Sequence, residues 1–158
     1  MVREFSAGGV VVRHMQGRWW IAVIEPEGRK GSGKKPVLAL PKGLVDGREK
    51  PEQAAVREVR EETGLEAALV TKLRDIRYVY VRSWGDGEKV FKIVSFYMLS
   101  YRGGNIDEIS AEMRVEVRRA LWVPLEEAGQ QLAYRGEREV VQRAQEYVAA
   151  HPEMTSHA

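Results

Sequence analysis

Three glutamates stand within five positions of one short stretch of the chain, at Glu58, Glu61 and Glu62. In a helix, side chains three and four positions apart are neighbours, and like charges at these spacings destabilise it by roughly 0.2–0.5 kcal/mol per pair. Surface helices usually mix the signs of their charges, so three carboxylates together indicate a need for a counter-charge. Carboxylate oxygens of this kind suit a hard divalent cation such as Mg²⁺. The alternative interpretation is an acidic face that only contacts water.

The sequence around these glutamates predicts a helix from Pro51 to Thr63. Proline suits the first position of a helix, the acidic Glu52 complements its positive end, and Gly64 suits its stop. Residues at helical spacing then form one apolar face, made of Ala55, Val56 and Val59. We expect this face to pack on the core and to hold the carboxylates rigidly beside it.

The spacing around the helix is more specific than the helix itself. Gly43 is followed after five positions by Glu49, and after seven more by the run REVREETGL, which covers residues 57–65. This pattern resembles the Nudix box, with every defining position filled between Gly43 and Leu65. The segments SAGGVVV and RALWVPLEEA also resemble the family's first strand and its later strand–turn–helix, so the resemblance spans most of the range from Phe5 to Val148.

The resemblance implies a Nudix fold of the α+β class, an α/β/α sandwich in which the box forms a loop–helix–loop beside a mixed sheet. It implies a pyrophosphohydrolase that uses Mg²⁺ or Mn²⁺ to cut a phosphoanhydride in a nucleoside diphosphate linked to another group. By the family's pattern, the metal ligands are Glu58, Glu61, Glu62 and the carbonyl of Gly43. The pattern also implies that Arg57 holds a glutamate in place, with Glu49 as a supporting residue and Glu61 as a further partner.

One more glutamate outside the box is expected as a metal ligand or general base, because Nudix hydrolases often recruit one from a later strand or loop. The candidates are Glu108, Glu112 and Glu116. We favour Glu116, because an extended segment would turn Val115 and Val117 to one side and Glu116 to the other, so that an apolar face anchors it. A strand glutamate that only contacts water or a neighbouring arginine is the alternative.

Three residues near or beyond the box are candidates for substrate binding. Lys42, in LPKG, resembles the diadenosine polyphosphate hydrolase branch, where a lysine at the mouth of the site would contact extra phosphates. Tyr78 and Tyr80 alternate along a predicted strand and so share one face, where they could stack on a base. The alternative to substrate binding is that the lysine only contacts water and that the tyrosines only pack against the sheet. The basic segment Glu27–Pro36 would add attraction for phosphate.

Dinucleoside polyphosphates such as diadenosine tetra- to hexaphosphate therefore lead the substrate classes. Nucleoside triphosphates or oxidised nucleotides, ADP-ribose and RNA 5′ ends remain open, as does a non-catalytic nucleotide-binding regulatory module. The intact box favours the hydrolase. No nucleic-acid-binding motif is visible, so we expect a small nucleotide rather than a nucleic acid as the partner.

The chain as a whole has 158 residues, 44% of them apolar and 30% charged, as in an ordinary globular domain. We assign residues 1–150 to this domain and expect residues 151–158 to form a disordered tail. The elements expected elsewhere are strands at Phe5–Val12, Trp19–Ile24, Val37–Leu40, Ala67–Arg82, Glu88–Tyr101 and Met113–Val123, and helices at Pro124–Gln131 and Glu137–Ala149.

The composition also limits where the protein works. There is no cysteine, and no apolar run approaches the roughly 18 residues of a membrane helix. The segment MVREFSAGGVVV lacks the layout of a signal peptide. These features favour a cytoplasmic protein without membrane contact. The net charge of +2 names no partner, and the oligomeric state stays open, with a homodimer as one option.

Overall fold

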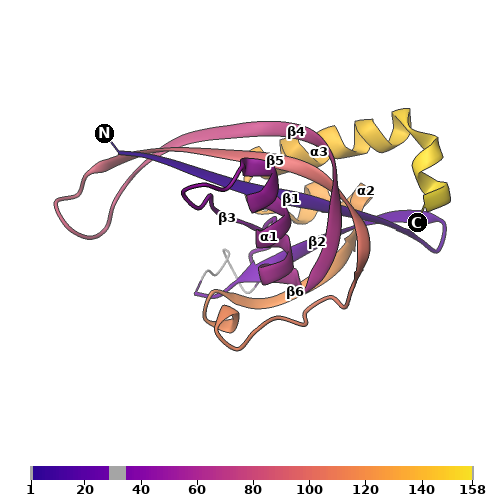
Figure 1. Ribbon diagram of the computed structural model, residues 1–158, viewed down its shortest axis with the longest axis horizontal. Helices are drawn as coiled ribbons and strands as arrows, with labels where there is room; N and C mark the ends of the chain where they lie inside the picture. The colour runs from indigo at the N-terminus through magenta and orange to yellow at the C-terminus, as the bar shows by residue number, and fades with distance from the viewer. Residues whose placement is uncertain (1, 29–34, 158) are drawn as a thin grey trace.

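The computed structural model describes residues 2–28 and 35–157 (Figure 1). Its elements, in chain order, are β1 (Val2–Met15), β2 (Arg18–Pro26), β3 (Lys42–Leu44), α1 (Pro51–Thr63), β4 (Leu65–Val81), β5 (Lys89–Gly104), the 3₁₀ helix η1 (Met113–Val115), β6 (Val117–Pro124), α2 (Leu125–Gln131), α3 (Arg135–Ala150) and the 3₁₀ helix η2 (Pro152–His157). The last of these occupies most of the segment for which the sequence predicted a disordered tail. None of the described helices has the length and apolar character needed to span a membrane.

The strands form one mixed sheet in the order β4-β5-β1-β2-β6, with β3 paired to β1. The pair β1–β5 is parallel, and the other strand pairs are antiparallel. Helix α1 packs on one face, where Ala54, Ala55 and Val59 join an apolar cluster with β1 and β5. Helices α2 and α3 cover the other face through a second and larger cluster. The predicted α+β sandwich, with a mixed sheet between helices, is confirmed.

Helix α1 has the bounds that its start and stop residues, Pro51 and Gly64, predict. It begins at Pro51, where the side chain of Gln53 accepts the backbone N–H of Lys50 at 3.0 Å. It ends at Gly64, whose φ of 84° is left-handed and whose N–H donates to the carbonyl of Arg60. A Cβ at Gly64 would lie 2.6 Å from the carbonyl oxygen of Glu108, so glycine is required here for space as well as for backbone angle.

Two expected strands differ in the structure. Val37–Leu40 is buried but forms only isolated bridges, because Ala39 pairs with Ile24 of β2 while Leu38 pairs with Leu132 after α2. The segment therefore makes one bridge to each of two neighbouring segments and forms no continuous ladder with either. The strand here is instead β3, which follows Pro41.

The segment Met113–Val123 is extended only from Val117 onward. Its first part curls into η1, where Arg114 donates to the side chain and carbonyl of Asp107 and to the carbonyl of Arg118. The predicted alternation around Glu116 is therefore wrong: Val115 is 75% exposed whereas Val117 is buried.

The longest hairpin of the molecule joins β4 and β5. The two strands stay paired from Leu65↔Gly104 to Val81↔Lys89. Gly85 and Gly87 take the left-handed φ values of the intervening turn, 72° and 71°. Figure 1 shows this turn projecting beyond the start of β1, at the end of the molecule away from the C-terminus. We call residues 80–84, at the end of this hairpin, the hairpin tip.

Candidate active site

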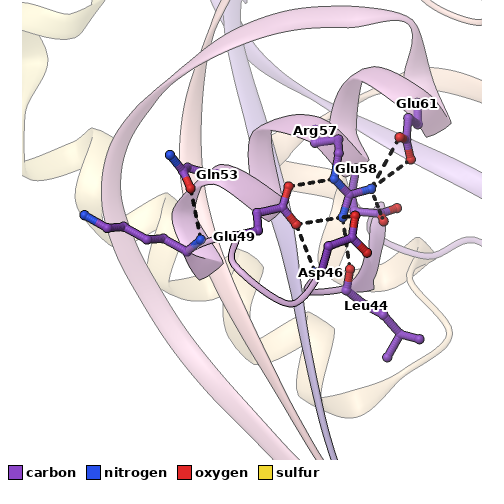
Figure 2. Close-up of polar contacts among 8 residues, drawn as sticks. Leu44, Asp46, Glu49, Gln53, Arg57, Glu58 and Glu61 are labelled. Atoms are coloured by element: carbon purple, nitrogen blue, oxygen red, sulfur yellow. Dashed lines mark hydrogen bonds and ion pairs between the residues drawn. The ribbon is translucent and has the colours of Figure 1, made fainter.

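Arg57 contacts two of the three glutamates of the predicted cluster, Glu58 and Glu61 (Figure 2). Its guanidinium donates to Glu49 at 2.7 and 2.9 Å, to Glu58 at 2.9 Å and to Glu61 at 3.1 Å. It also donates to the carbonyl of Leu44 at 3.0 Å, which ties helix α1 to β3. Hydrogen bonds from Arg57 hold the pKa of Glu49 below its usual range. The expected partnership of Arg57 with Glu49 and Glu61 is present, and Glu58 is an additional partner.

Glu58 and Glu62 are the two buried carboxylates of the cluster, at 8% and 7% exposure. Glu62 accepts the backbone N–H of Lys42 at 3.1 Å. Burial, followed by the nearby charge of Glu58, raises the pKa of Glu62 to about 8. Burial also raises the pKa of Glu58, although Arg57 acts in the opposite direction. A cation beside these two buried carboxylates would favour their charged forms and so lower both pKa values again.

Gly43 lies directly against the carboxylate of Glu58. A Cβ at Gly43 would stand 2.2 Å from the carboxyl carbon of Glu58 and 2.3 Å from both oxygens. No side chain fits there without displacing Glu58. The glycine of the box is thus explained by close approach, and it brings its backbone beside the carboxylates.

The oxygen donors fit a hard divalent cation such as Mg²⁺ or Mn²⁺. Glu58 and Glu62 each feel the charge of Glu116, which raises the pKa of both after the larger effect of burial. Within residues 2–28 and 35–157, however, no three acidic or histidine side chains converge tightly enough to form a finished metal site. Glu61, the third expected ligand, instead pairs with Arg57 and has a side chain that is 38% exposed. Glu58 and Glu62 are the residues best placed to hold a cation.

Glu116 reaches the site although its segment is not a strand. It follows η1, and its carbonyl accepts the backbone N–H of Glu27 at 2.8 Å, which anchors it to the end of β2. It lines the same cavity as Gly43 and Glu62. Of the three candidates for an extra carboxylate, Glu108 and Glu112 do not line this cavity, and Glu108 instead accepts a hydrogen bond from Asn105.

Lys42 is engaged by a residue that the sequence analysis missed. Its ammonium donates to one oxygen of Glu137 at 2.9 Å, and the other oxygen of Glu137 accepts the N–H of Leu40 at 2.8 Å. Burial opposes the charge of Lys42, but Glu137, together with Tyr78 and Glu62, outweighs burial and raises the pKa of Lys42. Glu137 is 3% exposed. The available signal was its place three and four positions before Val140 and Val141, on the apolar face of α3.

A cavity of about 870 Å³ connects these groups to the aromatic residues. Near the carboxylates its lining includes Lys42, Gly43, Glu62, Glu116 and Tyr134, whose ring lies 5.7 Å from the Lys42 ammonium. Along the β4–β5 hairpin the lining continues with Tyr78, Tyr80, Trp84 and Lys92. The rings of Tyr78 and Tyr80 lie 6.3 Å apart on one wall, so the two tyrosines share a face as their alternation predicted. Of the basic segment Glu27–Pro36, residues 29–34, including Arg29, Lys30 and Lys34, lie outside the described part of the chain.

Comparison with known families decides what kind of site this is. The family model of the NUDIX domain matches residues 3–144. The chain belongs to the NUDIX family. Hydrolases of the NUDIX family act on pyrophosphate bonds. A curated NUDIX relative is MutT4 of Mycobacterium tuberculosis, which carries the name of a mutator protein and is 35% identical over 147 residues. The match covers 93% of this chain but only 56% of that protein, so the chain spans little more than half of its relative's length.

Solved NUDIX structures share the fold. The Ap4A hydrolase of C. elegans superposes with a TM-score of 0.66 at 20% identity, covering 93% of this chain and 98% of that one. The NUDIX domain of Shewanella oneidensis NrtR, solved with ADP ribose, superposes with a TM-score of 0.64 at 16% identity, covering 94% and 90%. At these identities the likeness shows the fold alone.

Proposed function

We propose that this NUDIX protein hydrolyses a phosphoanhydride bond in a nucleoside diphosphate linked to another group, with dinucleoside polyphosphates as its preferred substrates. The observation that carries the proposal is that one cavity combines Glu62 and Glu116 in its lining with tyrosines along the sheet. Carboxylates suit a metal-bound diphosphate, and rings suit a base. We place the reaction in the cytoplasm, in keeping with a chain without cysteine.

The residues of the site have separate roles in this reaction. Three carboxylates, those of Glu58, Glu61 and Glu62, would hold Mg²⁺ or Mn²⁺. The carbonyl of Gly43 would be a further donor. When bound, the metal would neutralise phosphate charge and make a coordinated water more acidic. Arg57 keeps Glu58 oriented through its 2.9 Å bond. Water attacks phosphorus, the bridging P–O bond breaks, and the water's proton passes to a carboxylate, which we assign to Glu116.

Replacing Glu116 with glutamine should lower kcat at least about tenfold, the lower range for loss of a general base, with a smaller change in KM. The loss should shrink at high pH, where hydroxide replaces the base. Steady-state kinetics between pH 7 and pH 10 measure both effects. Glu112→Gln is the matched control, because it alters a nearby glutamate outside the cavity. If Glu112→Gln reproduces the effect and Glu116→Gln does not, the assignment is wrong.

The preference for a polyphosphate rests on charge and on shape. Lys42 keeps 27% of its side chain exposed while it is paired with Glu137, and it lines the cavity. Its charge is partly balanced by Glu137, which makes it a weaker attraction for phosphate than a free lysine. The cavity volume of about 870 Å³ is near the upper end for a small-molecule site and accommodates a ligand larger than one mononucleotide.

The experiment that tests the function is a substrate panel with Mg²⁺ and with Mn²⁺, in which mass spectrometry identifies the products. Diadenosine tetra- to hexaphosphates should exceed ADP-ribose, nucleoside triphosphates, oxidised nucleotides and capped or triphosphorylated RNA ends in kcat/KM. A preference for ADP-ribose would overturn the polyphosphate assignment. Absence of turnover on the whole panel, with nucleotide binding retained, would instead support a regulatory binding module.

A further inference from the structure

The strand register sets a scale along the cavity wall. Lys42 pairs with Gly8 of β1, and Gly8 pairs with Phe96 of β5, so these three residues form one row across the sheet. Lys92 pairs with Tyr78 in a row four residues farther along β5. At about 3.3 Å per residue, the Tyr78 row lies about 13 Å from the row of Lys42.

Tyr80 stands two rows farther still, because the row Val79↔Phe91 lies between it and Tyr78. It pairs with Val90, six residues along β5 from Phe96, which is about 20 Å from the row of Lys42. Its hydroxyl donates to Glu4 of β1 at 2.6 Å, so the ring is held in place. The rings of Tyr78 and Tyr80, whose centres are 6.3 Å apart, therefore continue the aromatic wall away from Lys42 and toward the hairpin turn.

Trp84 adds a second ring at the same end of the cavity. It is 64% exposed, yet it lines the cavity that contains Glu62. The guanidinium of Arg82 lies 5.8 Å from the centre of its ring, a contact that orients the indole. A large apolar ring held at the mouth of a polar cavity, beside a cation, suits a flat heterocycle on a phosphorylated sugar.

We propose that the hairpin tip, through Tyr80 and Trp84, forms a second ring-binding subsite for the distal nucleoside of a dinucleoside polyphosphate. The inference rests on the proposed function and names the group that the hairpin tip selects. With phosphates near Glu62 and Lys42, a base on a short chain reaches the Tyr78 row. Only a ligand with a second ring on a longer polyphosphate also reaches the hairpin tip.

Binding by calorimetry in magnesium-free buffer tests the subsite without turnover. Base stacking on an aromatic side chain is strong enough that Trp84→Ala should raise the Kd for diadenosine tetraphosphate about tenfold. The Kd for ATP, which has one base, should stay within about twofold, since ATP does not reach the hairpin tip. Trp84→Phe, which keeps a ring, should restore most of the affinity.

Val79→Ala is the matched control, because Val79 is 53% exposed on the same hairpin, lies outside the hairpin tip and does not line the cavity. It should leave both affinities unchanged. Equal weakening for ATP and diadenosine tetraphosphate, or no weakening for either, would overturn the subsite. The two proposals fail separately: a protein that binds diadenosine tetraphosphate through Trp84 but does not cleave it overturns the function alone. A protein that cleaves it with an unchanged Kd in Trp84→Ala overturns the subsite alone.

Discussion

The Glu62→Gln variant is expected to lose on the order of a thousandfold in kcat/KM, because it removes several kcal/mol of charge stabilisation at the metal. Glutamine keeps the size of the side chain and can still accept the N–H of Lys42, so the fold should be retained. Kinetics at saturating Mg²⁺, with circular dichroism as a check of folding, measure the loss. Glu66→Gln, an exposed glutamate of β4 outside the cavity, is the control. Full activity of Glu62→Gln would contradict the metal-binding role.

The same variant should make the metal-free protein more stable at alkaline pH. The pKa of Glu62 rises from its ordinary value of 4.5 to about 8 in the folded protein. Between these values the folded state keeps a proton that the unfolded state has released, so the free energy of unfolding falls as pH rises. Thermal unfolding in chelator should therefore show the wild-type Tm falling more than that of Glu62→Gln between pH 6 and pH 9. Parallel pH curves would contradict the raised pKa.

The Arg57→Ala variant is expected to damage both stability and activity. It leaves Glu49 and Glu58 without their cationic partner, and charge-assisted hydrogen bonds of this kind contribute about 2 kcal/mol. Because Arg57 orients a proposed metal ligand, kcat/KM should fall by about 10–100-fold. The loss of Tm should be larger in chelator than with Mg²⁺, since a bound cation replaces part of the missing positive charge.

Two further variants make the test of Arg57 specific. Arg57→Lys keeps the charge but lacks the planar fork that contacts Glu49 and Glu58 together, so it should recover only part of the activity. Arg60→Ala removes an exposed arginine from the next turn of α1 and should change little. An Arg57→Ala protein with wild-type kinetics would remove Arg57 from the mechanism.

The bounds of helix α1 could be predicted from the residues at its two ends. Pro51 and Gly64 bound α1 in the structure as in the sequence, because a helix start and stop depend on a few adjacent residues. Residues placed by distant partners were harder to predict. Glu116 is held by the backbone of Glu27, and Glu137 by Leu40 and Lys42, and neither contact has a local pattern. Glu116 was selected on an extended register that is absent, yet it lies in the cavity.

The parallel pairing of β1 with β5 has a consequence for how the chain folds. The ladder begins at Val2↔Val90 and runs to Val12↔Ser100, so each step joins residues 88 positions apart. During synthesis, α1 leaves the ribosome before β5, the strand that supplies part of its apolar floor. Pairing over such a long separation is slow because loop closure must precede the gain in contacts. Folding of this protein should therefore be limited by docking of the β4–β5 hairpin, and the buried carboxylates should remain hydrated until that step.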